Sequence, residues 1–120
     1  MTVINIVDVD TITPFITVGA ITTGNTEIVD VAADYVAKIN SLIIANIDGT
    51  NSATVTVSIS IDNGSNYHAI ASTVAVPADA TLILIDKNST FYLDETDLLR
   101  VTASANSDLT YAVSGELMTD

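Results

Sequence analysis

Hydrophobic and polar residues alternate along much of this chain with the two-residue period that is typical of β-strands. The clearest example is the stretch SATVTVSISID at residues 52–62. The pattern predicts that its aliphatic side chains fill a core: Val55, Val57, Ile59 and Ile61. It predicts that the alternate, hydroxyl-bearing side chains face outward: Thr54, Thr56, Ser58 and Ser60. This stretch is therefore expected to be a strand with one buried face.

Other short stretches show the same alternation or a continuous apolar run, and turn residues separate them. The predicted strands lie near residues 3–7, 12–22, 26–31, 35–47, 52–62, 66–76, 80–86, 90–93, 98–105 and 109–118. Asn-Gly and Asp-Gly pairs between them supply the positive φ angles that tight hairpin turns need. The pattern predicts an all-β, single-domain antiparallel β-sandwich, either a jelly roll or an immunoglobulin-like Greek key.

The segment TEIVDVAADYVAKINSLI, residues 26–43, admits a second interpretation. Its apolar residues also fit the spacing of a helix, which Thr26 would cap. Its β-branched residues favour two strands joined by a turn at AADY, residues 32–35. The second strand is apolar on both faces around residues 42–45. That suits a central strand covered on both sides, or a strand at a subunit contact.

The start of the chain is expected to form a separate part of the molecule. Residues 1–21 are predicted to be an N-terminal strand or arm, and residues 22–120 the sandwich domain. The arm either completes its own sheet or engages a neighbouring subunit, so its apolar residues enter a candidate assembly interface: Val3, Ile4, Ile6 and Val7. No basic region precedes an apolar run here, so no signal peptide is expected, and the apolar runs are too short to span a membrane.

Charge argues against two classes of partner. The chain carries 15 acidic residues against 3 lysines and arginines, a formal net charge of −12. Such a surface repels nucleic-acid phosphates and anionic lipids, so neither nucleic acid nor a membrane is expected as a partner. Surplus negative charge also keeps Thr-rich sheets from stacking on one another. The chain contains no cysteine, which excludes disulfides and thiolate metal sites.

Few residues suggest chemistry. His68 is the single histidine, and it is expected at the surface or on an edge strand, because a general base needs an orienting partner and a cleft. Neither a serine nucleophile motif nor a glycine-rich phosphate loop occurs, so we expect neither an enzyme nor a bound cofactor. The turn DETD offers oxygen ligands for calcium at Asp94, Glu95 and Asp97, although acidic residues are also ordinary turn residues.

The predicted outer strand faces favour contact with other molecules. Exposed strands of monomeric sheet proteins are usually protected by charged side chains. Here Thr54, Thr56 and Ser58 are short and uncharged, as are Thr102 and Ser104 of the stretch 98–105. We therefore include Thr54, Thr56 and Ser58 in the candidate assembly interface, with good strand formation as the alternative explanation.

Three stretches of the chain combine strands and turns in a characteristic order. The first is TTGNTEIVDVAADYVAKINSLIIANIDGTNSATVTVSI, a short strand, a turn and a long strand ending in Ala-Asn before an alternating strand. The second is VAVPADATLILIDKN, a Pro-Ala turn leading into an apolar strand. The third is FYLDETDLLRVTASANSDLTYAVSGEL, an acidic turn followed by the closing strands. Together these stretches resemble small virion proteins of tailed bacteriophages. The resemblance covers residues 22–118, with AADY standing where the family usually has Pro-Ala-Gly.

The resemblance implies a β-sandwich that is frequently trimeric and that decorates or cements the phage head. It implies binding to the major capsid protein between capsomers on the outer surface, location in the virion and assembly in the host cytoplasm. The alternative is a neck or tail accessory protein, or a carbohydrate- or receptor-binding module. A binding module of this kind should expose one or more of Tyr67, Tyr92 and Tyr111 on a concave face.

Overall fold

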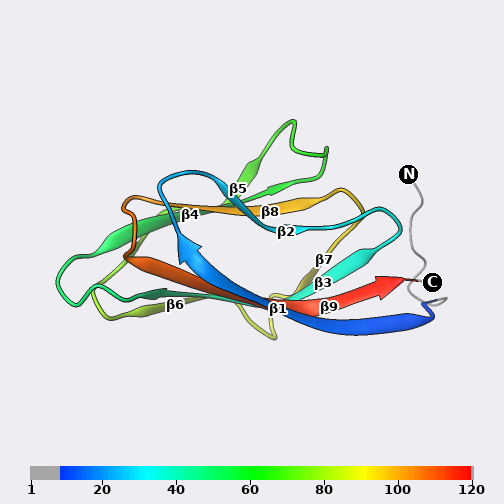
Figure 1. The fold of residues 1–120 in the computed structure, drawn as a ribbon, viewed down its shortest axis with the longest axis horizontal. Helices are drawn as coiled ribbons and strands as arrows, with labels where there is room; N and C mark the ends of the chain where they lie inside the picture. Colours follow the sequence, from blue (N-terminus) through cyan, green and yellow to red (C-terminus); the bar gives the residue numbers. More distant parts are fainter. Residues whose placement is uncertain (1–8, 120) are drawn as a thin grey trace.

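The computed structural model describes residues 9–119, which contain β-strands and no helix (Figure 1). The strands are β1 (Thr11–Ile21), β2 (Thr26–Asp30), β3 (Val36–Asn46), β4 (Ala53–Ser60), β5 (His68–Val76), β6 (Thr81–Ile85), β7 (Phe91–Leu93), β8 (Leu98–Ala103) and β9 (Leu109–Thr119). Each of these strands was predicted, with ends that differ by at most two residues. The strand predicted at residues 3–7 lies outside the described residues.

The strands form two antiparallel sheets that pack face to face (Figure 1). Sheet A has the order β1-β9-β3-β6, with β7 beside β3, and sheet B has the order β2-β8-β4-β5. The pairs β1–β9, β2–β8, β3–β6 and β4–β5 are nested one inside the next along the sequence. Nesting of this kind is what rolling one long hairpin into two sheets produces, so the fold is a jelly roll rather than an immunoglobulin-like sandwich.

The core lies between the two sheets, where the alternation of each strand brings its aliphatic side chains together. Sheet A contributes side chains with no exposed surface: Ile21, Ile39, Leu42, Ile44, Leu109 and Val113. Sheet B contributes a matching set: Val55, Val57, Val76, Leu99 and Val101. The prediction that residues 26–43 form two strands rather than a helix is therefore confirmed, because both strands face this core.

The turn between β2 and β3 forms without proline. Asp34 has a φ of 70°, in the left-handed region that aspartate tolerates better than most residues. The Tyr35 N–H donates to the Ala32 carbonyl at 3.2 Å, and the Asp34 N–H donates to Glu95 Oε2 at 2.7 Å. A positive φ and a long-range carboxylate contact thus replace the fixed φ of proline.

Residues 11–21 complete their own sheet, which is one of the two outcomes predicted for the start of the chain. β1 pairs with β9 over its whole length, from Thr11 with Thr119 to Ile21 with Leu109. Residues 11–21 are therefore the edge strand of sheet A and not a detached arm. The prediction that Val3, Ile4, Ile6 and Val7 contact a neighbour falls outside the described residues.

The predicted face of β4 is correct at its start and wrong at its end. Val55 and Val57 are fully buried, and Ile59 packs against the core, but Ile61 is 73% exposed. Ser60 was expected to face outward, yet it is completely buried. Its Oγ donates to Asp62 Oδ1 and accepts the Gly64 N–H, both at 2.8 Å. The strand ends at Ser60 because this hydroxyl holds the following loop.

Asp62 fixes the loop between β4 and β5. Its Oδ2 accepts a hydrogen bond from Asn66 Nδ2 at 2.8 Å, and its Oδ1 accepts from the Asn66 N–H at 2.9 Å. These hydrogen bonds, together with the one from Ser60, favour the ionised carboxylate and lower the pKa of Asp62 from 3.8 to about 2.

We expect Asp62 to contribute stability that is lost in acid. The pKa of Asp62 is lower in the folded state than in the unfolded state. Its contribution to the free energy of unfolding is therefore complete above pH 3.8 and disappears as the pH falls toward 2. In thermal melts, Asp62→Asn should therefore approach wild-type stability as the pH falls through this range. Asp10→Asn removes the same charge from an exposed position and serves as the control. A gap between the two variants that stayed constant down to pH 2 would contradict this role of Asp62.

Candidate assembly surfaces

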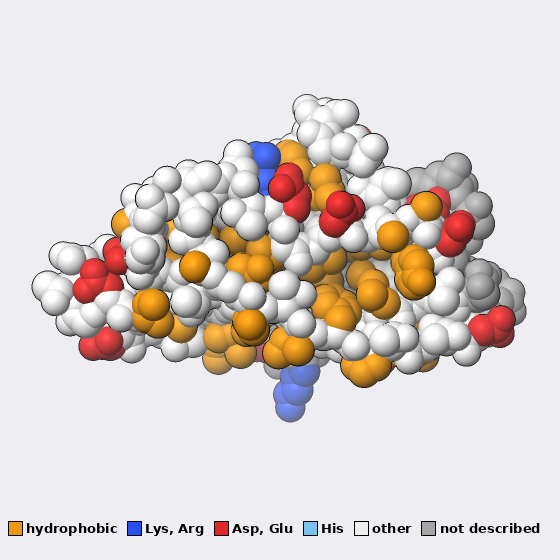
Figure 2. All heavy atoms as spheres, in the orientation of Figure 1, with side chains coloured by type: hydrophobic (Ala, Val, Ile, Leu, Met, Phe, Trp, Pro, Cys, Tyr) orange, Lys and Arg blue, Asp and Glu red, His pale blue; other side chains and the backbone are white. Residues whose placement is uncertain are grey.

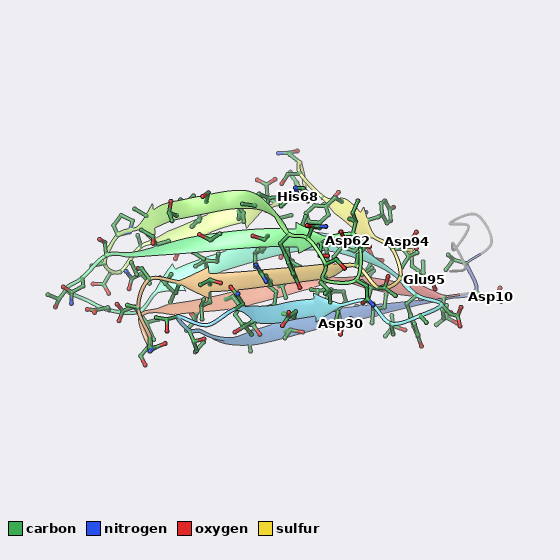
Figure 3. All side chains as sticks on the ribbon, turned by 90° about the horizontal axis from the view of Figure 1, so that it is seen from above. Asp10, Asp30, Asp62, His68, Asp94 and Glu95 are labelled. Atoms are coloured by element: carbon green, nitrogen blue, oxygen red, sulfur yellow. The ribbon has the colours of Figure 1, made fainter. Side chains whose placement is uncertain are left out.

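The acidic turn between β7 and β8 joins two loops. Glu95 Oε2 accepts the Asp34 N–H from the β2–β3 loop, and the Thr96 N–H donates to the Val31 carbonyl at 2.8 Å. Asp97 Oδ2 accepts the Asp94 N–H at 2.8 Å, which closes the turn on itself. Asp94 and Glu95 lie toward the end of the sandwich where Asp10 also lies (Figure 3).

Each of these carboxylates accepts a backbone N–H: Asp94 from Glu95, Asp97 from Asp94, and Glu95 from Asp34 of the β2–β3 loop. Glu95 is only 3% exposed, and burial raises the pKa of Asp97, with the negative charge of Asp94 adding to the effect. Glu95 Oε1 is buried and has no hydrogen-bond partner. Within residues 9–119, no three histidine, cysteine or acidic side chains are grouped so that they could hold a metal ion. The geometry of Asp94, Glu95 and Asp97 is that of a structural turn.

The residues that suggested catalysis or ligand binding lie apart from one another. His68 is exposed at the first residue of the edge strand β5, as predicted, beside the loop that carries Asp62 (Figure 3). Tyr92 is 53% exposed on β7 of sheet A, whereas Tyr111 is buried. Tyr67 lies in the loop before β5, and Arg100 Cζ of β8 in sheet B lies 3.5 Å from the centre of its ring. The tyrosines therefore form no shared platform for a sugar.

The outer face of sheet B is partly covered by the chain itself. Ser58, which was predicted to take part in assembly, is 8% exposed and aligns with Arg100 of β8. Thr54 and Thr56 are half-buried, and Thr56 Oγ1 accepts the Thr73 N–H at 3.0 Å. Two register shifts in the pairing of β4 with the edge strand β5 also make this face irregular. The face is less flat than the sequence suggested.

The outer face of sheet A is more apolar. Val18, Ala112, Ile43 and Ile83 are register partners on β1, β9, β3 and β6, so they form one row across the sheet. Val18 is 67% exposed, Ile83 61% and Ile43 37%. The neighbouring rows add further uncharged residues: Ile16, Ala20, Ser41, Ala45, Thr110 and Ser114. We call these residues together the sheet A face.

Lys38 and Glu116 bring charge to one margin of the sheet A face. Lys38 and Glu116 are register partners on neighbouring strands, two rows from Ile43. A positive and a negative side chain therefore lie across from each other. A shallow depression at the other margin is lined by Val18, Ile43 and Ala45. The sequence signalled part of this surface, because residues 42–45 are apolar on both faces. The contribution of β1 was missed.

Comparisons with known proteins show the fold but no family. No model of a protein family matches the chain, and no curated protein matches its sequence. The chain is similar in structure to a protein of Bacillus endospore appendages, described as disulfide-linked pili, with a TM-score of 0.50 and 13% identity. That alignment covers 91% of this chain and 87% of the pilus chain.

Two viral proteins are more distant in structure. A pentameric capsid protein from metagenomic phage sequences has a TM-score of 0.41 at 13% identity, over 87% of this chain and 60% of that one. The VP2 subviral particle of infectious bursal disease virus has a TM-score of 0.43 at 13% identity, over 92% of this chain and 33% of that one. The strand order by itself makes the chain a jelly-roll β-sandwich. Its described residues include no helix that could cross a membrane.

Proposed function

We propose that this chain is a structural protein of a phage virion, and specifically a decoration or cement protein on the outer surface of the head. The observation that carries the proposal is the sheet A face, a continuous uncharged surface on a chain with a net charge of −12. We further propose that this face contacts the major capsid protein between capsomers. The protein acts by binding and not by catalysis.

The sheet A face and the acidic loops differ in the free energy needed to bury them against another protein. Contiguous exposed apolar surface on a protein marks a site of interaction, and burying it releases about 25 cal/mol for each Å². Carboxylates carried into an interface without partners cost several kcal/mol each. The sheet A face can therefore meet another protein closely, whereas the acidic loops remain in solvent and keep free copies apart.

Two comparisons support an assembly role without deciding its kind. The stretches 22–59, 74–88 and 91–117 resemble virion proteins of tailed phages, and jelly rolls recur in viral capsids and in lectins alike. The endospore protein forms pili that are disulfide-linked. This chain contains no cysteine, so it would have to assemble through noncovalent contacts.

A cement protein stabilises the shell by mass action. If the chain binds only the expanded lattice, every occupied site adds its binding free energy to the stability of that lattice. Neighbouring sites hold the partners at high effective concentration, so modest contacts suffice when they are repeated over the shell. A trimer would place three sheet A faces around one point between capsomers.

Co-sedimentation with empty, expanded shells that lack this protein tests the proposal. We expect saturable binding at a fixed ratio to the major capsid protein, together with a higher melting temperature of the shell. Unexpanded shells of the same phage are the control, because a cement protein should bind them weakly. Retention on isolated tails or necks, with no binding to shells, would move the function to tail assembly or host attachment.

A further inference from the structure

A groove runs along the side of the sandwich where the edge strands of the two sheets face each other. β1 pairs with β9 and β2 with β8, and in the described part of the chain neither has a partner on its other side. Figure 2 shows hydrophobic side chains gathered along this side, between β2 and β1. The groove is lined by Thr13, Phe15, Thr17, Ile28, Asp30 and Leu117.

The groove is closed at one end and open at the other. Residues 22–25 carry the chain from β1 in sheet A to β2 in sheet B and close one end (Figure 1). Near this end Ile21 is completely buried. Farther along β1, Phe15 is half-buried and Thr13 is exposed. The side of β1 that faces the space between the two sheets is therefore uncovered toward Thr11.

An extended segment with aliphatic side chains fits such a groove. It can pair its backbone with a free strand edge while alternate side chains fill the space between the sheets. Phe15, Leu117 and Ile28 present apolar surface to it. Asp30 is the one charged residue that lines the groove, so an acidic segment is disfavoured there.

We propose that this groove receives residues 1–8 of a neighbouring copy, so that each subunit donates a strand to the next. The inference rests on the proposed function, because it requires the chain to assemble. The segment MTVINIVD holds four aliphatic residues, and alternation places Ile4 and Ile6 on one face and Asn5 on the other. At about 3.3 Å per residue, an extended segment of this length can span the groove from Thr13 to Thr17.

The direction of the chain before β1 favours a neighbour over the same copy. Val9 packs against Val36 and Met118, which are register partners on the outer side of sheet A. The Asp10 N–H donates to the Thr119 carbonyl at 3.1 Å. The chain therefore reaches β1 from the side of sheet A that is opposite to the groove, and its own first residues would have to pass around the edge of the sheet.

Engineered cysteines test the contact directly, since the natural chain has none. Ile6→Cys and Thr17→Cys variants, carrying tags of different size, are mixed on shells and oxidised. We expect a disulfide between the two variants, because a disulfide forms only when the Cα atoms approach within about 7 Å. Thr17 is exposed, so the substitution leaves the core intact.

Matched pairs control for random collision. Asn5→Cys with Thr17→Cys moves one partner to the opposite face of the donated strand. In the pair Ile6→Cys with Thr11→Cys, the second cysteine stays on the same side of β1 as Thr17 and is also exposed. It lies outside the residues that line the groove. Both pairs should lose the cross-link. Equal yields from all three pairs would overturn the assignment.

A double substitution provides a second measurement. Ile4→Asp with Ile6→Asp replaces the two aliphatic side chains that the proposed contact would bury, so the association between copies should weaken by roughly a hundredfold or more. Thr2→Asp with Asn5→Asp adds the same charges on the segment without removing an aliphatic side chain, and it should retain most of the association.

The outcomes separate this inference from the proposed function. Shell binding with the Ile6–Thr17 cross-link between chains supports both. Shell binding without the cross-link overturns the strand donation and leaves the proposed function standing. A cross-link that forms only within one chain, in the Ile6→Cys, Thr17→Cys double variant, overturns the donation to a neighbour. Failure of the wild-type chain to bind shells contradicts the proposed function itself.

Discussion

Replacing Gly115 with alanine is expected to lower the free energy of unfolding by about 3 kcal/mol or more, at the upper end of overpacking effects. A Cβ at this position would lie 2.0 Å from the Lys38 carbonyl oxygen and 3.0 Å from Phe15 Cε1. The carbonyl belongs to the backbone of the central strand β3, so it cannot swing aside as a side chain can. The register shift between Ile39 and Ser41 brings this backbone close to β9.

Urea unfolding followed by circular dichroism measures the effect. Gly24→Ala is the matched control, because its nearest non-neighbouring atom is Thr22 Oγ1 at 3.7 Å and its φ is not positive. We expect this control to stay within about 0.5 kcal/mol of the wild type. Since a domain of this kind is stabilised by roughly 5–15 kcal/mol, the loss at Gly115 should be plain. Equal stability of the two variants would mean that β3 and β9 pack differently.

The positions of the strands could be predicted because the signals are local. Alternation in residues 52–57 and the turns around Asp48 and Asp62 depend on a few adjacent residues. The order of the strands could not, because the pairs are far apart in sequence, as with Thr11 and Thr119. Many strand pairings satisfy the same alternation. A jelly roll and an immunoglobulin-like sandwich therefore agree equally well with the sequence until the pairing is known.

The face that β1 turns to the core depends on its partner strand. Both faces of β1 carry apolar side chains, with Ile16 and Val18 on one and Phe15 on the other. Phe15 is the register partner of Gly115, and Tyr111 is the register partner of Gly19. In each pair the glycine leaves room for the aromatic ring opposite, as the 3.2 Å approach of Tyr111 to a Cβ at Gly19 shows.

These aromatic–glycine pairs explain why the sheet A face was missed. With Phe15 and Tyr111 turned inward, the aliphatic residues Ile16 and Val18 must face outward. Nothing in β1 alone reveals this, because the glycines that select the face include Gly115 of β9. The exposure of Ile61 just after β4 has a similar cause, since Ser60 is held by Asp62 and Gly64 of the following loop.

We expect Ile83→Asp to weaken binding to shells by roughly a hundredfold or more, because an unpaired carboxylate buried in an interface costs several kcal/mol. Ile83 is 61% exposed at the end of the apolar row that begins at Val18. Its substitution should leave the fold intact, since it lies outside the core on the edge strand β6. The dissociation constant from co-sedimentation and the melting temperature of the free protein are measured together.

The control for this prediction is Ile61→Asp, which makes the same chemical change at a residue that is 73% exposed but lies after β4, away from the sheet A face. It should bind shells like the wild type, because a solvated carboxylate pays no desolvation cost. Val18→Asp, at the opposite end of the row, should weaken binding to shells as much as Ile83→Asp does. If Ile61→Asp weakened binding while Ile83→Asp and Val18→Asp did not, the contact would lie on sheet B, and the acidic charge of the chain would no longer explain which surface assembles.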